Sequence, residues 1–173
     1  CNFSSLHFDS PEFPELVAAI ADRHNVPHAL LELEITESAI MRNPQIVCAQ
    51  VLRLKERGFM IAIDDFGSGY SSLGQLQQLM ADVLKLDRSF VGAERIVIGN
   101  VIHMAGELGM QVICEGVENA KQAEMLIELG CYYAQGFYYA KPMPRDVFER
   151  LLEKGKVLQD EKENKKGAWQ RKP

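Results

Sequence analysis

The segment FMIAIDDFGSGYSSL, residues 59–73, starts as a short apolar run and ends in two adjacent carboxylates and a glycine-containing turn. Successive side chains of an extended strand face opposite sides, so Ile61 and Ile63 share one face while Ala62 and Asp64 share the other. A polar group at the carboxyl end of an apolar strand is typical of the active-site rim of a βα barrel. The segment therefore predicts a buried strand that carries chemistry at its end.

Five other apolar runs repeat this pattern, and stretches with helical spacing separate most of them. The runs are Cys1–Ser5, Leu30–Ile35, Val83–Asp87, Gln111–Glu115 and Tyr132–Phe137. The expected helices are Pro11–His24, Gln45–Arg57, Arg95–Leu108 and Ala120–Leu129. Asp9 and Ser10 are candidate caps of the first helix, and a glycine follows each of the other three, where a helix C-cap favours it. Strand–helix units in this number predict parallel strands covered by helices.

Two architectures suit such units. An open doubly wound sheet would favour a glycine-rich phosphate turn after the first strand, and Asn2–Asp9 contains none. We therefore expect an α/β fold of the TIM-like (β/α)8 barrel type. Because such a barrel needs about 250 residues, about six of its eight strands should lie in this chain. We expect the domain to span residues 1–154 and residues 155–173 to form a polar, solvated tail.

The composition limits the classes of function that this chain can have. The chain has 173 residues, 47% of them hydrophobic and 25% charged, which is typical of one soluble domain. The formal net charge of −5 disfavours a nucleic acid polymer as partner. The four cysteines form no CxxC pair, and the sequence has no apolar run of about 18 residues and no leader after Cys1. We therefore expect a cytoplasmic domain cut from a longer protein.

Ionisable or amide groups recur at the other predicted strand ends. They are Glu34 and Glu37, Lys85 and Asp87, Glu115 and Glu118, and Gln135. Taken singly, each is explained as well by a surface charge, a salt bridge or a helix cap, and Asp64 or Asp65 could cap a helix that starts near Ser71. Their shared position at strand ends favours one common site. Oxygen ligands without Cys or His indicate Mg²⁺ or Mn²⁺ rather than zinc.

Five motifs then occur in a fixed order: LELEITES at 31–38, DDFGSGYSSL at 64–73, VLKLDRSFV at 83–91, ICEGVEN at 113–119 and LGCYYAQGFYYAKPMP at 129–144. This series resembles the EAL-domain phosphodiesterases, which hydrolyse the bacterial second messenger cyclic di-GMP to the linear dinucleotide pGpG. The opening Asn2-Phe3-Ser4 is similar to the strand that starts with an asparagine metal ligand in that family. The resemblance extends from residue 1 to about Leu152.

The resemblance implies two divalent ions in the site. Asn2, Glu34 and Asp64 would hold the first ion, and Asp64 would bridge to the second. Asp65 and Glu115 would complete the second set. Such a pair would orient the phosphodiester and make a water more acidic for in-line attack.

The resemblance also implies catalytic roles. Lys85 would stabilise negative charge that develops on the phosphate, with Asp87 positioning it. Glu115 is a candidate general base as well as a ligand, and Glu118 completes the catalytic candidates.

Three further residues would serve the substrate and the loop above it. Gln135 would contact the phosphate or its water, as would Lys85. Phe137, from a cluster of aromatic residues that we expect mostly to pack the last strand, would lie near the bases. Glu37 would anchor the loop Phe66–Ser72, which the family often uses for homodimer contacts.

The sequence also departs from the family. Nothing matches the Glu-Ala-Leu motif, whose glutamate is a metal ligand, or the substrate-binding arginine that follows it; both belong to earlier strands. Ser68 replaces the usual threonine, and the link between Val91 and Ile96 is short, which leaves the dimer geometry open. The alternative is therefore an inactive EAL module that binds cyclic di-GMP or a protein partner. An unrelated barrel enzyme acting on an enolate or sugar phosphate is a third interpretation. Sensory or GGDEF-like domains are expected in the full-length protein, and a cytoplasmic domain is compatible with a membrane tether in upstream segments.

Overall fold

The computed structural model describes residues 1–67 and 73–154. Within them, six parallel strands form one sheet whose spatial order is the chain order. The strands are β1 (Asn2–Phe3), β2 (Glu32–Thr36), β3 (Met60–Phe66), β4 (Val83–Leu86), β5 (Gln111–Cys114) and β6 (Tyr133–Ala134). The α-helices are α1 (Ser5–Phe8), α2 (Phe13–Arg23), α3 (Glu37–Arg42), α4 (Pro44–Glu56), α5 (Leu73–Leu79), α6 (Arg95–Glu107), α7 (Ala120–Glu128) and α8 (Arg145–Lys154), and short 3₁₀ turns lie at His28–Leu30 and Arg88–Gly92.

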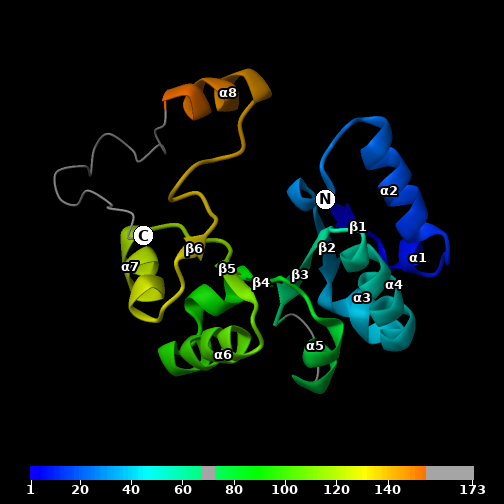
Figure 1. Cartoon of the computed structure of the whole chain (residues 1–173). Coiled ribbons are helices and arrows are strands. Elements are labelled where there is room, and N and C mark those ends of the chain that lie inside the picture. Colours follow the sequence, from blue (N-terminus) through cyan, green and yellow to red (C-terminus); the bar gives the residue numbers. More distant parts are fainter. Residues whose placement is uncertain (68–72, 155–173) are drawn as a thin grey trace.

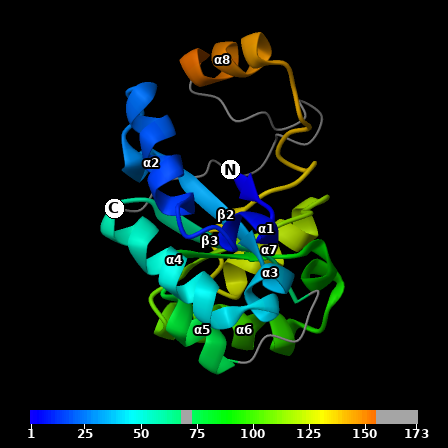
Figure 2. The same cartoon turned by 90° about the vertical axis from the view of Figure 1, so that its right-hand side faces the viewer.

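The strand order identifies the architecture. In a doubly wound sheet the order reverses at a switch point, whereas in a barrel each strand pairs with the next one along the chain. The sequential order therefore confirms the expected TIM-like α/β fold. Helices α2 to α7 follow one another in an arc around the strands, and α8 stands apart from them at the end of an extended segment (Figure 1, Figure 2). Within the described residues, β1 and β6 are the edges of the sheet.

The alternation read from the sequence places the core between sheet and helices. Leu33 and Ile35 of β2 and Ile61 and Ile63 of β3 are fully buried, while Glu32 and Glu34 are only partly covered. Each fully buried aliphatic side chain of this size contributes about 1.5–3 kcal/mol relative to an exposed one. Burial of the aliphatic set thus fixes the face on which the acidic side chains lie. None of the described helices is long and apolar enough to cross a membrane.

The helix ends follow the glycine signals but not the proposed N-caps. Gly58, Gly109 and Gly130 follow α4, α6 and α7 with φ of +87°, +75° and +86°, the left-handed conformation that glycine adopts without strain. The helix expected at Pro11–His24 is α2. The expectation that Asp9 or Ser10 caps it is wrong, because α2 starts at Phe13 and its N-cap residue is Glu12. The carbonyl of Ser10 instead accepts hydrogen bonds from the Phe13 N–H and the Gln50 side chain.

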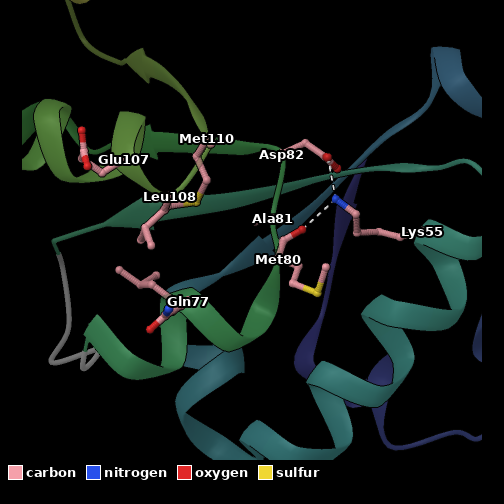
Figure 3. A pocket seen from close by; sticks show the side chains of 10 residues that line it. Lys55, Gln77, Met80, Ala81, Asp82, Glu107, Leu108 and Met110 are labelled. Atoms are coloured by element: carbon pink, nitrogen blue, oxygen red, sulfur yellow. Dashed lines mark hydrogen bonds and ion pairs between the residues drawn. The ribbon is translucent and has the colours of Figure 1, made fainter.

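A partly buried ion pair holds β3 and β4 together at the amino ends of the strands. Lys55 Nζ, from α4, donates to Asp82 Oδ1 at 2.6 Å and to the Met80 carbonyl at 2.7 Å (Figure 3). Asp82 Oδ2 accepts from the Ile61 N–H at 2.9 Å, and the Asp82 N–H donates to the Ile61 carbonyl. Asp82 therefore helps to set the register in which β4 lies beside β3.

Replacing Asp82 tests this contribution. Asp82→Ala leaves the Ile61 N–H and the Lys55 ammonium without their acceptor, so we expect the free energy of unfolding to fall by about 1–3 kcal/mol in urea denaturation. Glu149→Ala is the control, because it removes an exposed i,i+4 pair with Arg145 and should cost less than about 0.5 kcal/mol. Equal effects of the two substitutions would contradict the role given to Asp82.

The four cysteines differ in burial. Cys114 and Cys131 are buried, Cys48 is half-buried and Cys1 is exposed, so the thiols are less uniformly buried than the apolar segments around them suggest. Burial, with a smaller contribution from the neighbouring Cys131, raises the pKa of the Cys114 thiol to about 12. The folded chain thus keeps this thiol protonated and unreactive.

Thiol labelling at pH 8 should therefore follow burial. We expect Cys1 to react first, and Cys114 and Cys131 to react only on unfolding, as measured by mass spectrometry of the alkylated chain. Because the unfolded thiol ionises near pH 9 and the folded Cys114 near pH 12, this group should make the fold less stable as the pH rises between these values. Native labelling of Cys114 at the rate of Cys1 would contradict this account.

Candidate active site

Five neighbouring strands, β1 to β5, carry the predicted site residues. On β1 and β2, Asn2 lies opposite Glu34. Asp64, near the end of β3, lies opposite Thr36 of β2. Lys85 precedes the last residue of β4, and the N–H of Glu115 donates to the Leu86 carbonyl at 3.0 Å, which continues the β4–β5 ladder. Parallel pairing alone therefore gathers these side chains at one end of the sheet.

Lys85 is the centre of the group. Its Nζ lies 2.9 Å from Glu115 Oε1, 3.0 Å from Asp64 Oδ1 and 3.1 Å from Glu34 Oε1. Three carboxylates from different strands thus face the three protons of one ammonium. Ion pairs of this kind stabilise only when the geometry compensates for the loss of water, and the Lys85 side chain is just 9% exposed.

Burial and pairing act on this ammonium in opposite directions. Burial by itself disfavours the charged form, but hydrogen bonds to Glu115, Asp64 and Glu34 outweigh it, so the pKa of Lys85 lies above its ordinary value. Asp64 Oδ1 is buried, and apart from its ion pair with Lys85 no described atom donates a well-aligned hydrogen bond to it. A buried carboxylate oxygen with spare acceptor capacity is suited to a cation.

An irregularity in β3 turns a second carboxylate toward the same point. Regular alternation would place Asp64 and Asp65 on opposite faces. The register of β3 on β4 shifts between Ile63 and Phe66, and Asp65 has a φ of +54°, a left-handed conformation that is costly for a residue other than glycine. As a result, Asp64, Asp65 and Glu115 each offer an oxygen within 4.8 Å of the others.

The surroundings of Asp65, including the nearby negative charges, shift the pKa of its carboxyl. Partial burial, followed by the charges of Asp64 and Asp87, raises the pKa of the Asp65 carboxyl, while Lys85 opposes the rise. Within the described residues the group contains oxygen ligands only, without His or Cys. The residues present therefore fit a hard divalent cation such as Mg²⁺ or Mn²⁺.

Glu37 lies under the start of the loop that follows β3. It is 1% exposed, and its Oε2 accepts a hydrogen bond from the Gly67 N–H at 2.9 Å. Gly67 has a φ of +100°, and a Cβ there would overlap the Phe90 ring, so only glycine fits. The contact expected of Glu37 is therefore present at Gly67. Residues 68–72, to which the anchoring role and the dimer contacts also refer, lie outside the described residues.

Two of the proposed catalytic residues form hydrogen bonds with groups other than Lys85. Asp87 caps the 3₁₀ turn that follows β4, where it accepts from the Ser89 N–H at 2.9 Å. Hydrogen bonds from Ser89 and Arg88 lower the pKa of the Asp87 carboxyl. Glu118 is exposed at the start of the link to α7, and its N–H donates to Gln122 Oε1. Among the described residues, no ion pair or hydrogen bond joins either carboxylate to Lys85, so their roles stay predictions.

The last predicted residues lie on the rim beside Glu115. The Gln135 N–H donates to the Cys114 carbonyl at 2.8 Å, and the Gln135 carbonyl accepts from Val117. Gln135 and Phe137 are exposed, and the Lys141 ammonium lies 5.7 Å from the centre of the Phe137 ring. The aromatic cluster packs less than expected: Tyr138 and Tyr139 contact the core, but Tyr132, Tyr133 and Phe137 are exposed, because β6 is an edge strand.

Sequence reasoning missed Gly136 and Gly116, which let rim segments approach each other closely. A Cβ on Gly136 would overlap the backbone of Val117, and one on Gly116, whose φ is +69°, would overlap Arg88. The Glu-Gly and Gln-Gly pairs after two predicted strands were the available signal. Gly136 thus lets the segment after β6 approach the segment after β5, and Gly116 lets the latter approach the 3₁₀ turn Arg88–Gly92.

Comparison with known proteins identifies the class of domain that this fold and site define. The family model of the EAL domain matches residues 1–142. The chain belongs to the EAL-domain family.

Named relatives and solved structures agree with that assignment. The chain is 37% identical to the probable cyclic di-GMP phosphodiesterase PdeB of Escherichia coli, over 88% of this chain and 30% of PdeB. It is 38% identical to the cyclic di-GMP phosphodiesterase RocR of Pseudomonas aeruginosa, over 78% of this chain and 36% of RocR. The chain thus spans about a third of the length of these two relatives.

Two solved structures share the fold. The EAL domain of Mycobacterium smegmatis DcpA superposes with a TM-score of 0.84 at 38% identity, covering 91% of this chain and 73% of that one. The phosphodiesterase PaMucR in complex with c-di-GMP gives a TM-score of 0.80 at 35% identity, covering 85% and 62%.

Gly136 offers a test of the rim geometry. Gly136→Ala forces the added methyl group against rigid backbone, so we expect the free energy of unfolding to fall by about 1–3 kcal/mol. Gly106→Ala is the matched control: nothing lies within 4 Å of the new Cβ, and in helix α6 the change should be neutral or stabilising by up to about 1 kcal/mol. Chemical denaturation measures both, and a neutral Gly136→Ala would show that the close approach is absent.

Proposed function

We propose that this site hydrolyses cyclic di-GMP to the linear dinucleotide pGpG with the help of bound divalent metal ions. The observation that carries the proposal is the convergence of Glu34, Asp64 and Glu115 from three strands on one buried lysine. A phosphodiesterase needs both elements, carboxylates for metal ions and a cation beside the phosphate. Membership of the EAL family and the names of PdeB and RocR support this substrate.

The proposed cofactors are two Mg²⁺ or Mn²⁺ ions per site. Asn2, Glu34 and Asp64 are the proposed ligands of one ion, and Asp64, Asp65 and Glu115 those of the other. The buried, poorly satisfied Asp64 Oδ1 and the mutual proximity of the second set support this choice. Bound divalent ions supply Lewis acidity to a phosphoryl oxygen and make a nearby water more acidic.

The chain's own groups carry the remaining work. The Lys85 ammonium, shielded from water, is placed to stabilise negative charge on the phosphate more strongly than an exposed lysine could. Glu115, which is partly exposed, can accept the proton of the attacking water. Gln135 offers an amide to the phosphate at the exposed rim, and the free face of Phe137 offers a stacking surface to a guanine base.

The remaining partners are proposals of the same kind. A homodimer would use the loop 66–72, whose first residues Glu37 holds through the Gly67 N–H. Sensory or GGDEF-like domains of the full-length protein would control the site. The domain would work in the cytoplasm, and this location is compatible with a membrane tether outside this chain.

Asp64→Asn is the sharpest test of the proposed chemistry. The amide keeps the size of the side chain but removes the charge proposed to serve both ions, so turnover of cyclic di-GMP should fall on the order of 10²-fold or more. Chromatography of the nucleotide with Mg²⁺ or Mn²⁺ present measures this, and EDTA should abolish turnover by the unchanged chain. Asp146→Asn is the matched control, because among the described residues the Asp146 side chain pairs with Arg150 alone, at an exposed position in α8.

Three outcomes separate the alternatives. Loss of pGpG formation in Asp64→Asn alone supports the proposal. Equal turnover and equal bound metal in the variant and the unchanged chain would rule out the metal role of Asp64. Tight binding of cyclic di-GMP by the unchanged chain in equilibrium dialysis, without any pGpG, would replace hydrolysis by the binding module.

A further inference from the structure

Lys85 takes the carboxylate oxygens that a divalent ion also needs. Its ammonium lies within 3.1 Å of one oxygen each of Glu34, Asp64 and Glu115. Asp64 and Glu115 also belong, with Asp65, to the group whose oxygens lie within 4.8 Å of one another. Asp64 and Glu115 are therefore shared with this group, and Glu34, the third partner of Lys85, is a proposed ligand of the other ion.

A cation of charge +2 and an ammonium cannot both approach these oxygens without strong repulsion. Two cations that share a carboxylate lie a few ångströms apart, and their repulsion is large where water is largely excluded. The Lys85 and Asp64 side chains are only 9% and 12% exposed, so solvent screens this repulsion poorly. The ammonium and the ion therefore compete for these oxygens.

We propose that Lys85 is a resident counter-cation of the acidic site, which balances the charge of the carboxylates until divalent ions displace its ammonium from them. The inference rests on the proposed metal-dependent function. It adds that Lys85 lowers the affinity of the site for metal, and that metal binding releases this ammonium from Asp64 and Glu115. A released ammonium is then free to turn to the phosphate of the substrate.

Lys85 could also act in the opposite direction and strengthen metal binding by keeping the carboxylates in place. The backbone already does this. Glu34 and Asp64 lie on β2 and β3, which pair over five residues, and the Glu115 N–H is held by the Leu86 carbonyl. The carboxylates therefore have little room to separate when the lysine charge is removed, and competition is the larger effect.

The experiment compares Mn²⁺ affinity by isothermal titration calorimetry in the unchanged chain and in two neutral variants. Lys85→Met and Lys85→Gln should both bind Mn²⁺ about tenfold more tightly or better, because a competing positive charge is gone. Hydrolysis should fall in the same variants, so affinity and activity move in opposite directions. Lys55→Met is the matched control: Lys55 is also paired with an aspartate, Asp82, but at the other end of the sheet (Figure 3), and its loss should leave Mn²⁺ affinity unchanged.

A second measurement needs no substitution at the site. In NMR spectra of the unchanged chain, saturating Mg²⁺ should move the side-chain ¹⁵Nζ resonance of Lys85, assigned through its side-chain carbons, and leave that of Lys55 in place. This decides the matter if the Lys85 variants do not fold.

The outcomes separate this inference from the proposed function. Unchanged or weaker Mn²⁺ binding in both folded variants, or a Lys85 resonance that ignores Mg²⁺, would overturn the counter-cation role even if the chain hydrolyses cyclic di-GMP. Tighter Mn²⁺ binding in both variants, without any hydrolysis by the unchanged chain, would support the inference while the proposed function fails.

Discussion

Three ion pairs from Lys85 to Glu34, Asp64 and Glu115 join the ends of four strands, and the chemistry of the site depends on them. Without a cation, carboxylates this close would repel each other; at Asp65, partial burial first and then the charges of Asp64 and Asp87 raise the pKa of the carboxyl. The aliphatic core supplies the free energy that keeps the acidic face in place. The site is thus an electrostatically costly arrangement that the rest of the fold stabilises, which is common where charge serves catalysis rather than stability.

The two ends of the sheet use the same pair of residue types for different purposes. At the amino ends, Lys55 and Asp82 form a pair in which both carboxylate oxygens accept hydrogen bonds. Asp82 accepts from Lys55 and from the Ile61 N–H, and Lys55 also donates to the Met80 carbonyl. At the carboxyl ends, no described atom donates an aligned hydrogen bond to Asp64 Oδ1, and one ammonium serves three carboxylates. The first arrangement is complete and structural. The second leaves acceptor capacity for a further cation.

Much of the fold was predictable because burial of aliphatic side chains follows strand alternation: Leu33 and Ile35 are fully buried and Glu34 is only partly covered, as the pattern indicates. The helix ends at Gly58, Gly109 and Gly130 were readable for the same local reason. The convergence of Asp64 with Asp65 could not be predicted in this way. Alternation places neighbouring side chains on opposite faces, and the left-handed backbone at Asp65 turns its carboxylate toward that of Asp64. The capping role of Asp87 and the close approach at Gly136 depend on tertiary contacts that a linear pattern does not contain.

A crystal structure of the chain with Mn²⁺, located by its anomalous scattering, would test the account most directly. The account predicts manganese bonded to Asp64 together with Asp65 and Glu115, and a Lys85 ammonium that has left at least one of its three carboxylates. Manganese bound elsewhere, or all three ion pairs of Lys85 intact beside a bound ion, would contradict it.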